Sequence, residues 1–159
     1  MKESVFNELQ LLLSMYDSSQ FQFDDPEVPL MLENSFEDVV TLKNINSSCS
    51  FAIKLEDPIE SELHFRIPIG YPDQDKLSFN CTICYGEKFA SSSNEVGMHK
   101  KVNDDIGELL NESEGSCDIL SVINKFKESC EQYLRTVSSP SSHNSNGIFQ
   151  SIIYKELFF

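Results

Sequence analysis

Basic residues are scarce in this chain of 159 residues. Lysine and arginine together number 12 against 26 aspartates and glutamates, which gives a formal net charge of −14 at pH 7. Such a charge repels phosphate backbones and anionic lipid surfaces, so we expect neither nucleic-acid nor membrane binding. Acidic surfaces are usually just solvated faces, although this one could also attract a basic protein partner.

Long apolar runs are absent as well. No window reaches the length of a membrane span, and the first residues lack the basic and apolar regions of an export signal. We therefore expect a cytoplasmic protein that could also enter the nucleus. Five cysteines without regular spacing fit that compartment, because an odd count of this kind is typical of reduced thiols.

Recognisable catalytic and metal-binding motifs are lacking too. With only six glycines, the chain has neither a P-loop nor a dinucleotide-binding fingerprint, and His64, His99 and His143 have no metal-ligand spacing. Cys81 and Cys84 form a CxxC pair, but they fall in a predicted strand, where residues three apart point to opposite faces. We predict no catalytic residues, no cofactor and no metal site, with Cys81 as a buried thiol.

A hydrophobic content of 40% is enough for a core. The pattern of the residues predicts that this core belongs to an α+β domain. Apolar residues at helical spacing predict an opening amphipathic helix. These are Val5, Phe6, Leu9, Leu12, Leu13 and Tyr16. Residues 21–38 have no clean period, so we expect irregular structure there with a short helical piece.

Three strands are predicted next, because apolar and polar residues alternate in three successive segments. Their apolar positions are Phe51, Ile53 and Leu55, then Leu63, Phe65 and Ile67, then Leu77, Phe79, Cys81, Ile83 and Tyr85. Short connections between such half-buried strands indicate an antiparallel meander. An earlier strand near residues 41–46 is ambiguous.

Two helices then follow. Ser92 and Glu95 have the spacing of a capping box, and the second helix begins near Ser116 or Asp118 and ends near Arg135. Their apolar stripes are Met98, Val102, Ile106, Leu109 and Leu110, and Ile119, Ile123, Phe126, Cys130 and Tyr133. The order of elements predicts a two-layer sandwich, an antiparallel meander covered on one face by helices.

The composition shifts near the end of the chain. We predict a domain over residues 1–136, a flexible Ser-rich linker over 137–147 and an apolar tail over 148–159. The tail has three interpretations: an added strand or helix of the same domain, the start of a second domain, or a disordered end. We favour the second.

A proline-bounded turn separates the second and third predicted strands. Pro68 and Pro72 fix φ and remove two backbone donors, while Gly70 tolerates dihedral angles that other residues resist. Tyr71 lies between them, and a bulky side chain beside such a turn usually packs under it. We predict a structural role for these four residues.

This turn, together with the opening helix, carries a resemblance. Residues 8–16, residues 21–26 and the segment Ile67-Pro68-Ile69-Gly70-Tyr71-Pro72 are similar to the RWD family, whose fold is related to ubiquitin-conjugating enzymes. The similarity covers residues 1–136, although Lys76 replaces a further proline usual in the family. The resemblance implies a non-catalytic protein-interaction module, related to domains that bind partners in translation control and in ubiquitin or SUMO conjugation.

Two alternatives to that function stay open. An inactive or weakly active ubiquitin-conjugating-enzyme variant would need a thiolate nucleophile and a nearby asparagine, and no His-Pro-Asn triplet follows the turn. Cys117 is the one thiol worth testing, because a helix N-terminus lowers a thiol pKa. The other alternative is structural support for a missing C-terminal domain.

Overall fold

The structure, a computed structural model, describes residues 2–34, 36, 48–84, 92–112, 117–138 and 154–158. Five strands form one antiparallel sheet in the order of the sequence. The strands are β1 (Phe21–Phe23), β2 (Cys49–Leu55), β3 (Ser61–Ile67), β4 (Ser78–Cys84) and β5 (Tyr154–Phe158). The predicted α+β class and the antiparallel connection of β2, β3 and β4 are therefore confirmed.

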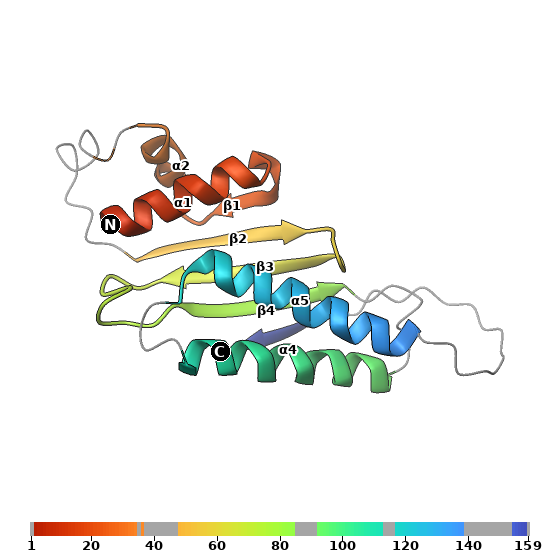
Figure 1. Ribbon diagram of the computed structural model, residues 1–159. Helices are drawn as coiled ribbons and strands as arrows, with labels where there is room; N and C mark the ends of the chain where they lie inside the picture. Colours follow the sequence, from red (N-terminus) through yellow and green to blue (C-terminus); the bar gives the residue numbers. More distant parts are fainter. Residues whose placement is uncertain are drawn as a thin grey trace.

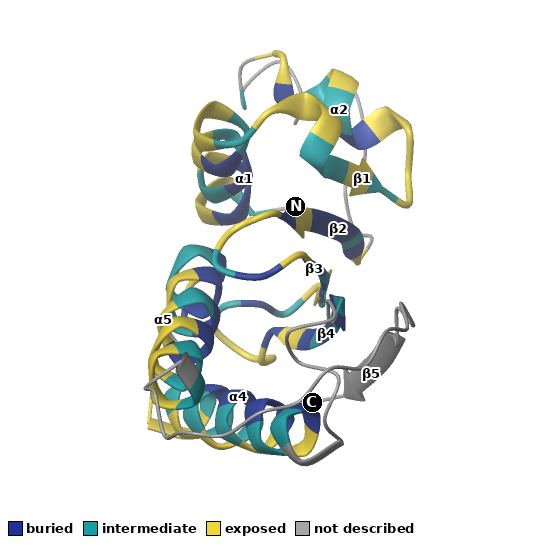
Figure 2. Cartoon of the chain, turned by 90° about the vertical axis from the view of Figure 1, so that its right-hand side faces the viewer, coloured by how far each residue is buried: buried dark blue, intermediate teal, exposed yellow. Residues whose placement is uncertain are grey.

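Among the described residues, four α-helices accompany the sheet (Figure 1). They are α1 (Glu3–Met15), α2 (Glu27–Leu32), α4 (Ser92–Glu112) and α5 (Ile119–Ser138). Figure 2 shows α1 and α5 along the same side of the sheet, with α4 beneath α5 and the dark blue, buried positions turned inward. The predicted apolar stripes form this core, and the side chains of Leu9, Met98, Val102, Ile106 and Phe126 are fully buried.

Several predicted boundaries need correction. Residues 21–38 contain the expected short helix α2, but also the strand β1, whose three residues are too few to display a clear alternation. Helix α4 begins at Ser92, the first residue of the predicted capping box. Helix α5 runs to Ser138, beyond the predicted end at Arg135. The possible strand at 41–46 lies outside the described residues.

A row of phenylalanines crosses the sheet from β1 to β4. Phe23 pairs in register with Phe51, Phe51 with Phe65, and Phe65 with Phe79. Their ring centroids are 5.5, 5.2 and 5.2 Å apart in that order. Aromatic pairs at such distances add stabilisation beyond that of burial, so this row fixes the register of four strands.

The last described element lies at the edge of the sheet beside β4. Residues 154–158 pair antiparallel with β4, and Asn80 is opposite Phe158 while Cys84 is opposite Tyr154. A strand added to the same sheet was one of the three interpretations of the apolar tail. The described part of the tail has this arrangement.

Candidate functional site

The predicted turn between β3 and β4 is present and well connected. The backbone N–H of Tyr71 donates to the carbonyl oxygen of Pro68 at 3.2 Å, and that of Gln74 donates to Gly70 at 2.8 Å. The Tyr71-Pro72 peptide bond is cis. Lys2, just before α1, donates from Nζ to the Gly70 carbonyl at 3.1 Å and so attaches the start of the chain to the turn.

Gly70 contributes to the turn in a different way from the one predicted. Its φ does not lie in the left-handed region, so conformational freedom does not explain the glycine. Its backbone N–H donates to Oδ2 of Asp75 at 3.1 Å. A Cβ atom at Gly70 would overlap that carboxyl group, with Cγ of Asp75 only 2.8 Å away. The glycine therefore provides space for the side chain that closes the turn.

Tyr71 joins the turn to the start of α5. Its side chain is only 4% exposed, as expected for a residue that packs under the turn. Its hydroxyl donates a hydrogen bond of 2.8 Å to the carbonyl oxygen of Cys117 and lies 3.5 Å from Oε2 of Glu8. Burial raises the pKa of Tyr71 strongly, and the negative charge of Glu8 adds to this effect. The phenol is therefore a neutral donor.

Glu8 of α1 reaches the same helix end. Its Oε1 accepts a hydrogen bond from the backbone N–H of Ile119, the first residue of α5. Burial raises the pKa of Glu8, and the neighbouring Asp118 raises it further, whereas the hydrogen bond from Ile119 acts in the opposite direction. A carboxylate at a helix N-terminus is favourable because it satisfies unpaired N–H groups and complements the helix dipole.

Asp118 caps α5, and it is one of the two residues near which this helix was predicted to begin. Its Oδ1 accepts a hydrogen bond of 2.6 Å from the backbone N–H of Ser121, three residues later. This is the usual N-cap arrangement. The start of α5 therefore carries two acidic side chains, Asp118 from its own cap and Glu8 from α1.

Beside this junction lies a surface hollow between α1, the turn and the start of α5. Its lining consists of Ser4, Asn7, Glu8, Leu11, Tyr71, Pro72, Asp118 and Leu120. Leu11 is 50% exposed, and Met15, one helical turn further along α1, is 53% exposed. We call Leu11, Met15 and the hollow the α1 surface. It combines accessible apolar side chains with two carboxylates.

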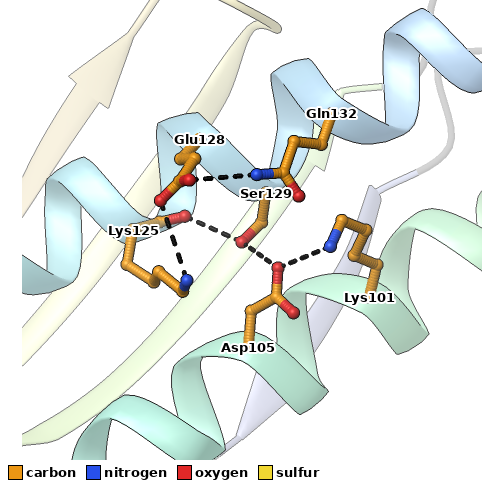
Figure 3. A network of polar contacts seen from close by, with 6 residues as sticks. All are labelled: Lys101, Asp105, Lys125, Glu128, Ser129 and Gln132. Atoms are coloured by element: carbon orange, nitrogen blue, oxygen red, sulfur yellow. Dashed lines mark hydrogen bonds and ion pairs between the residues drawn. The ribbon is translucent and has the colours of Figure 1, made fainter.

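A polar network between α4 and α5 is another cluster of ionisable residues (Figure 3). The buried hydroxyl of Ser129 lies 2.6 Å from Oδ2 of Asp105 and 2.8 Å from the carbonyl oxygen of Lys125. Lys101 donates to the same Oδ2 at 2.8 Å. Burial would raise the pKa of Asp105, but the hydrogen bonds from Lys101 and Ser129 outweigh it and lower that pKa.

This network fits a packing role better than a catalytic one. Ser129 has no histidine among its hydrogen-bond partners, and both of its contacts are to acceptors, so its proton is held between them. Nucleophilic catalysis by serine needs a base that removes the hydroxyl proton, whereas Asp105 is already engaged by Lys101. The network instead connects the two long helices α4 and α5.

Of the thiols and histidines selected from the sequence, His64 and Cys84 line one surface hollow, together with Glu62 and Thr82. Cys81 is fully buried, whereas Cys84 on the other face of β4 is half-buried, and Cys117 is 8% exposed beside the cap of α5. His64 lies on β3 with its Nε2 3.2 Å from Oε1 of Glu62, and His99 is buried in α4. In the part of the chain that the structure describes, no group of three His, Cys, Asp or Glu side chains could hold a metal ion. His143 lies outside the described residues.

Comparison of the chain with protein-family models, with curated proteins and with solved structures gave no match. Within the described residues, no helix combines the length and the apolar character that crossing a membrane requires.

Proposed function

We propose that this chain is a non-catalytic protein-interaction module of the RWD type, which binds a protein partner through the α1 surface. The α+β architecture is compatible with the resemblance seen in the opening helix and the turn. The observation that carries the proposal is the pair of exposed apolar residues on α1. Leu11 and Met15 are about half exposed and one helical turn apart. Leu11 lines the hollow, and Met15 continues from it along α1.

The chemistry of the surface indicates the kind of partner. Apolar side chains at spacing i and i+4 on a helix are typical anchors for a partner helix or groove. Glu8 and Asp118 add negative charge, although both accept hydrogen bonds from the start of α5. Together with the net charge of −14, this favours a partner that presents apolar side chains next to basic ones.

The test compares partner capture by surface variants. Leu11→Ser with Met15→Ser removes both exposed apolar side chains and should leave the fold intact, because neither residue belongs to the buried core. Val96→Ser is the matched control, since Val96 is at least as exposed as Leu11 and Met15 but lies on α4. Proteins captured by the wild type should be identified by mass spectrometry, then produced pure for binding measurements.

We expect the Leu11 and Met15 double variant to bind such a purified partner at least ten-fold more weakly, with the Val96 variant close to wild type. Equal binding by all three proteins would exclude the α1 surface. A thioester formed with ubiquitin in the presence of activating enzyme and ATP, and lost in Cys117→Ser, would overturn the non-catalytic function itself.

A further inference from the structure

The two edges of the five-stranded sheet would differ greatly without β5. On one side, β1 has only three residues and is followed at once by Asp24, Asp25 and Pro26. Short strands, charges and proline are the common devices that prevent an edge from pairing with another chain. This edge is therefore protected by its own sequence.

The edge formed by β4 has none of these devices. Its seven residues, Ser78–Cys84, include neither a proline nor a charged side chain. A long uncharged edge offers a row of backbone donors and acceptors to any extended segment. In the structure this row is occupied by residues 154–158 of the same chain, which pair with β4 over its last five residues.

The segment that covers the edge comes from far along the sequence. Helices α4 and α5 and the Ser-rich stretch lie between β4 and β5 in the sequence, whereas β2, β3 and β4 follow one another with no helix between them. A covering strand of this kind is bound through backbone pairing, which any extended segment of the same polarity can reproduce. The tether gives the chain's own segment an effective concentration on the order of millimolar, so it competes with such a segment.

The side chain of Asn80 on β4 would be matched better by a segment other than residues 154–158. Oδ1 of Asn80 is shielded from solvent and has no hydrogen-bond partner among the described residues. The register places Phe158 opposite Asn80, and phenylalanine contains no side-chain donor. An unpaired buried acceptor is unfavourable, so a segment with a donor at this position would gain a hydrogen bond that the tail cannot make.

We propose that the β4 edge is a strand-addition site for an extended segment of a protein partner with a hydrogen-bond donor opposite Asn80, and that residues 154–158 occupy it as an internal competitor. The partner strand runs antiparallel to β4. This proposal concerns a different surface from the α1 surface and does not depend on it.

The experiment releases the internal strand in the full-length chain. The double substitution Lys155→Pro and Glu156→Pro places prolines at two adjacent positions. Alternate residues of a strand donate to the same neighbouring strand, so one of the two prolines removes a donor of the hydrogen-bond ladder with β4. Phe149→Pro with Gln150→Pro is the matched control, because these substitutions precede the paired residues. Amide hydrogen exchange reports the pairing directly, with the amides of β2 and β3 as the check that the fold persists.

Binding is measured with two fluorescent peptides in all three proteins. One has the sequence of residues 152–159, and the other carries glutamine in place of Phe158, each with two added lysines for solubility. The backbone N–H of Cys84 donates to Glu60, so alternate amides, those of Cys81 and Ile83, face β5. In the released variant, we expect exchange at Cys81 and Ile83 to accelerate at least ten-fold and to slow again when peptide is added. The released variant should bind both peptides at least ten-fold more tightly than wild type and the control, and the glutamine peptide more tightly than the native one.

Three results would overturn the proposal. Unchanged exchange at Cys81 and Ile83 in the released variant would show that residues 154–158 do not cover the edge. Equal peptide binding by the released variant and the control would show that the open edge does not accept strands. A dimer of the released variant that excess peptide does not disperse would assign the edge to a second copy of the chain.

Discussion

The hydroxyl of Tyr71 donates a 2.8 Å hydrogen bond to the carbonyl oxygen of Cys117, 46 residues later in the chain. This bond connects the proline-bounded turn with the start of α5, where Glu8 of α1 also binds. Three segments distant in sequence therefore meet at one buried phenol. The turn supports the end of α5 as well as reversing the chain between two strands.

Substitution of Tyr71 separates packing from hydrogen bonding. Tyr71→Phe keeps the ring but leaves the buried Cys117 carbonyl without its donor, and we expect a loss of about 1–2 kcal/mol in the free energy of unfolding. Tyr71→Ala also removes the ring and should cost about 3 kcal/mol or more. Urea unfolding measures both values.

Tyr16→Phe is the control for this series, because the hydroxyl of Tyr16 is half-buried and only accepts a bond from Lys127. Its stability should change by less than about 0.5 kcal/mol. Equal stability of Tyr71→Phe and wild type would mean that the bond to Cys117 contributes nothing.

The cysteines should differ in reactivity in a way that tests the enzymatic alternative. Burial raises the pKa of Cys49 to about 11 and that of Cys130 to about 12, and it raises the pKa of Cys81 strongly. Thiolates are the reactive form, so these three thiols should resist alkylation in the folded protein. Cys84 is the most exposed of the five and should react first.

Mass spectrometry of the chain after brief treatment with iodoacetamide gives the order of modification. Cys117 should follow Cys84, because its side chain is nearly buried beside the cap of α5. If Cys117 were modified much faster than Cys84, it would have the activated thiolate that a ubiquitin-conjugating enzyme requires.

Periodicity was sufficient to predict the local elements of this fold. Each of β2, β3 and β4 alternates over seven residues, and the apolar stripes of the long helices follow from spacing alone. The strand β1 has only Phe21 and Phe23 on one face, which is too short a pattern for a period to appear. Its place in the sheet comes from packing against Phe51.

The candidate sites could not be predicted from the sequence, because they depend on long-range contacts. Glu8 and Ile119 are 111 residues apart, and no local pattern relates them. The pairing of β4 with residues 154–158 was visible only as a short apolar tail with several interpretations. By contrast, the burial of Tyr71 could be predicted from its position between two prolines, because a bulky side chain beside such a turn usually packs under it.

Two glycines of α4 provide a matched pair for testing the contact between α4 and α5. A Cβ at Gly97 would lie 2.8 Å from Cζ and 2.9 Å from Cε2 of Tyr133, whereas a Cβ at Gly107 would meet nothing within 4 Å. Alanine is favoured over glycine in a helix by about 0.5–1 kcal/mol. Gly107→Ala should therefore stabilise the protein by about that amount.

Gly97→Ala should instead destabilise it by about 1–2 kcal/mol, because the ring of Tyr133 must move away from α4. Tyr133→Leu in the Gly97→Ala background should recover part of that loss, since the shorter side chain relieves the overlap. Thermal unfolding monitored by circular dichroism compares the four proteins. Stabilisation by both alanines would show that the helices do not approach as closely as described.

Glu8 and Asp105 should give the folding stability opposite dependences on pH. The pKa of Glu8 is raised above its ordinary 4.5 by burial, so the folded state binds this proton more tightly than the unfolded state. Its contribution is then largest below pH 4.5 and is lost as the pH rises through the folded-state pKa. The pKa of Asp105 is lowered below 3.8, so its contribution is present above that value and is lost as the pH falls.

Urea unfolding between pH 3 and pH 7 separates the two groups. Glu8→Gln keeps an oxygen that can accept from Ile119 but has no charge, so the decline in stability above pH 4.5 should become shallower. Asp105→Asn should be less stable than wild type at neutral pH and should lose less stability on acidification. Glu3→Gln and Asp104→Asn, on exposed neighbours in the same helices, should follow the wild-type curve. A stability curve of Glu8→Gln parallel to that of the wild type would mean that the Glu8 carboxyl group titrates alike in the folded and unfolded states. Its place at the start of α5 would then have no electrostatic consequence.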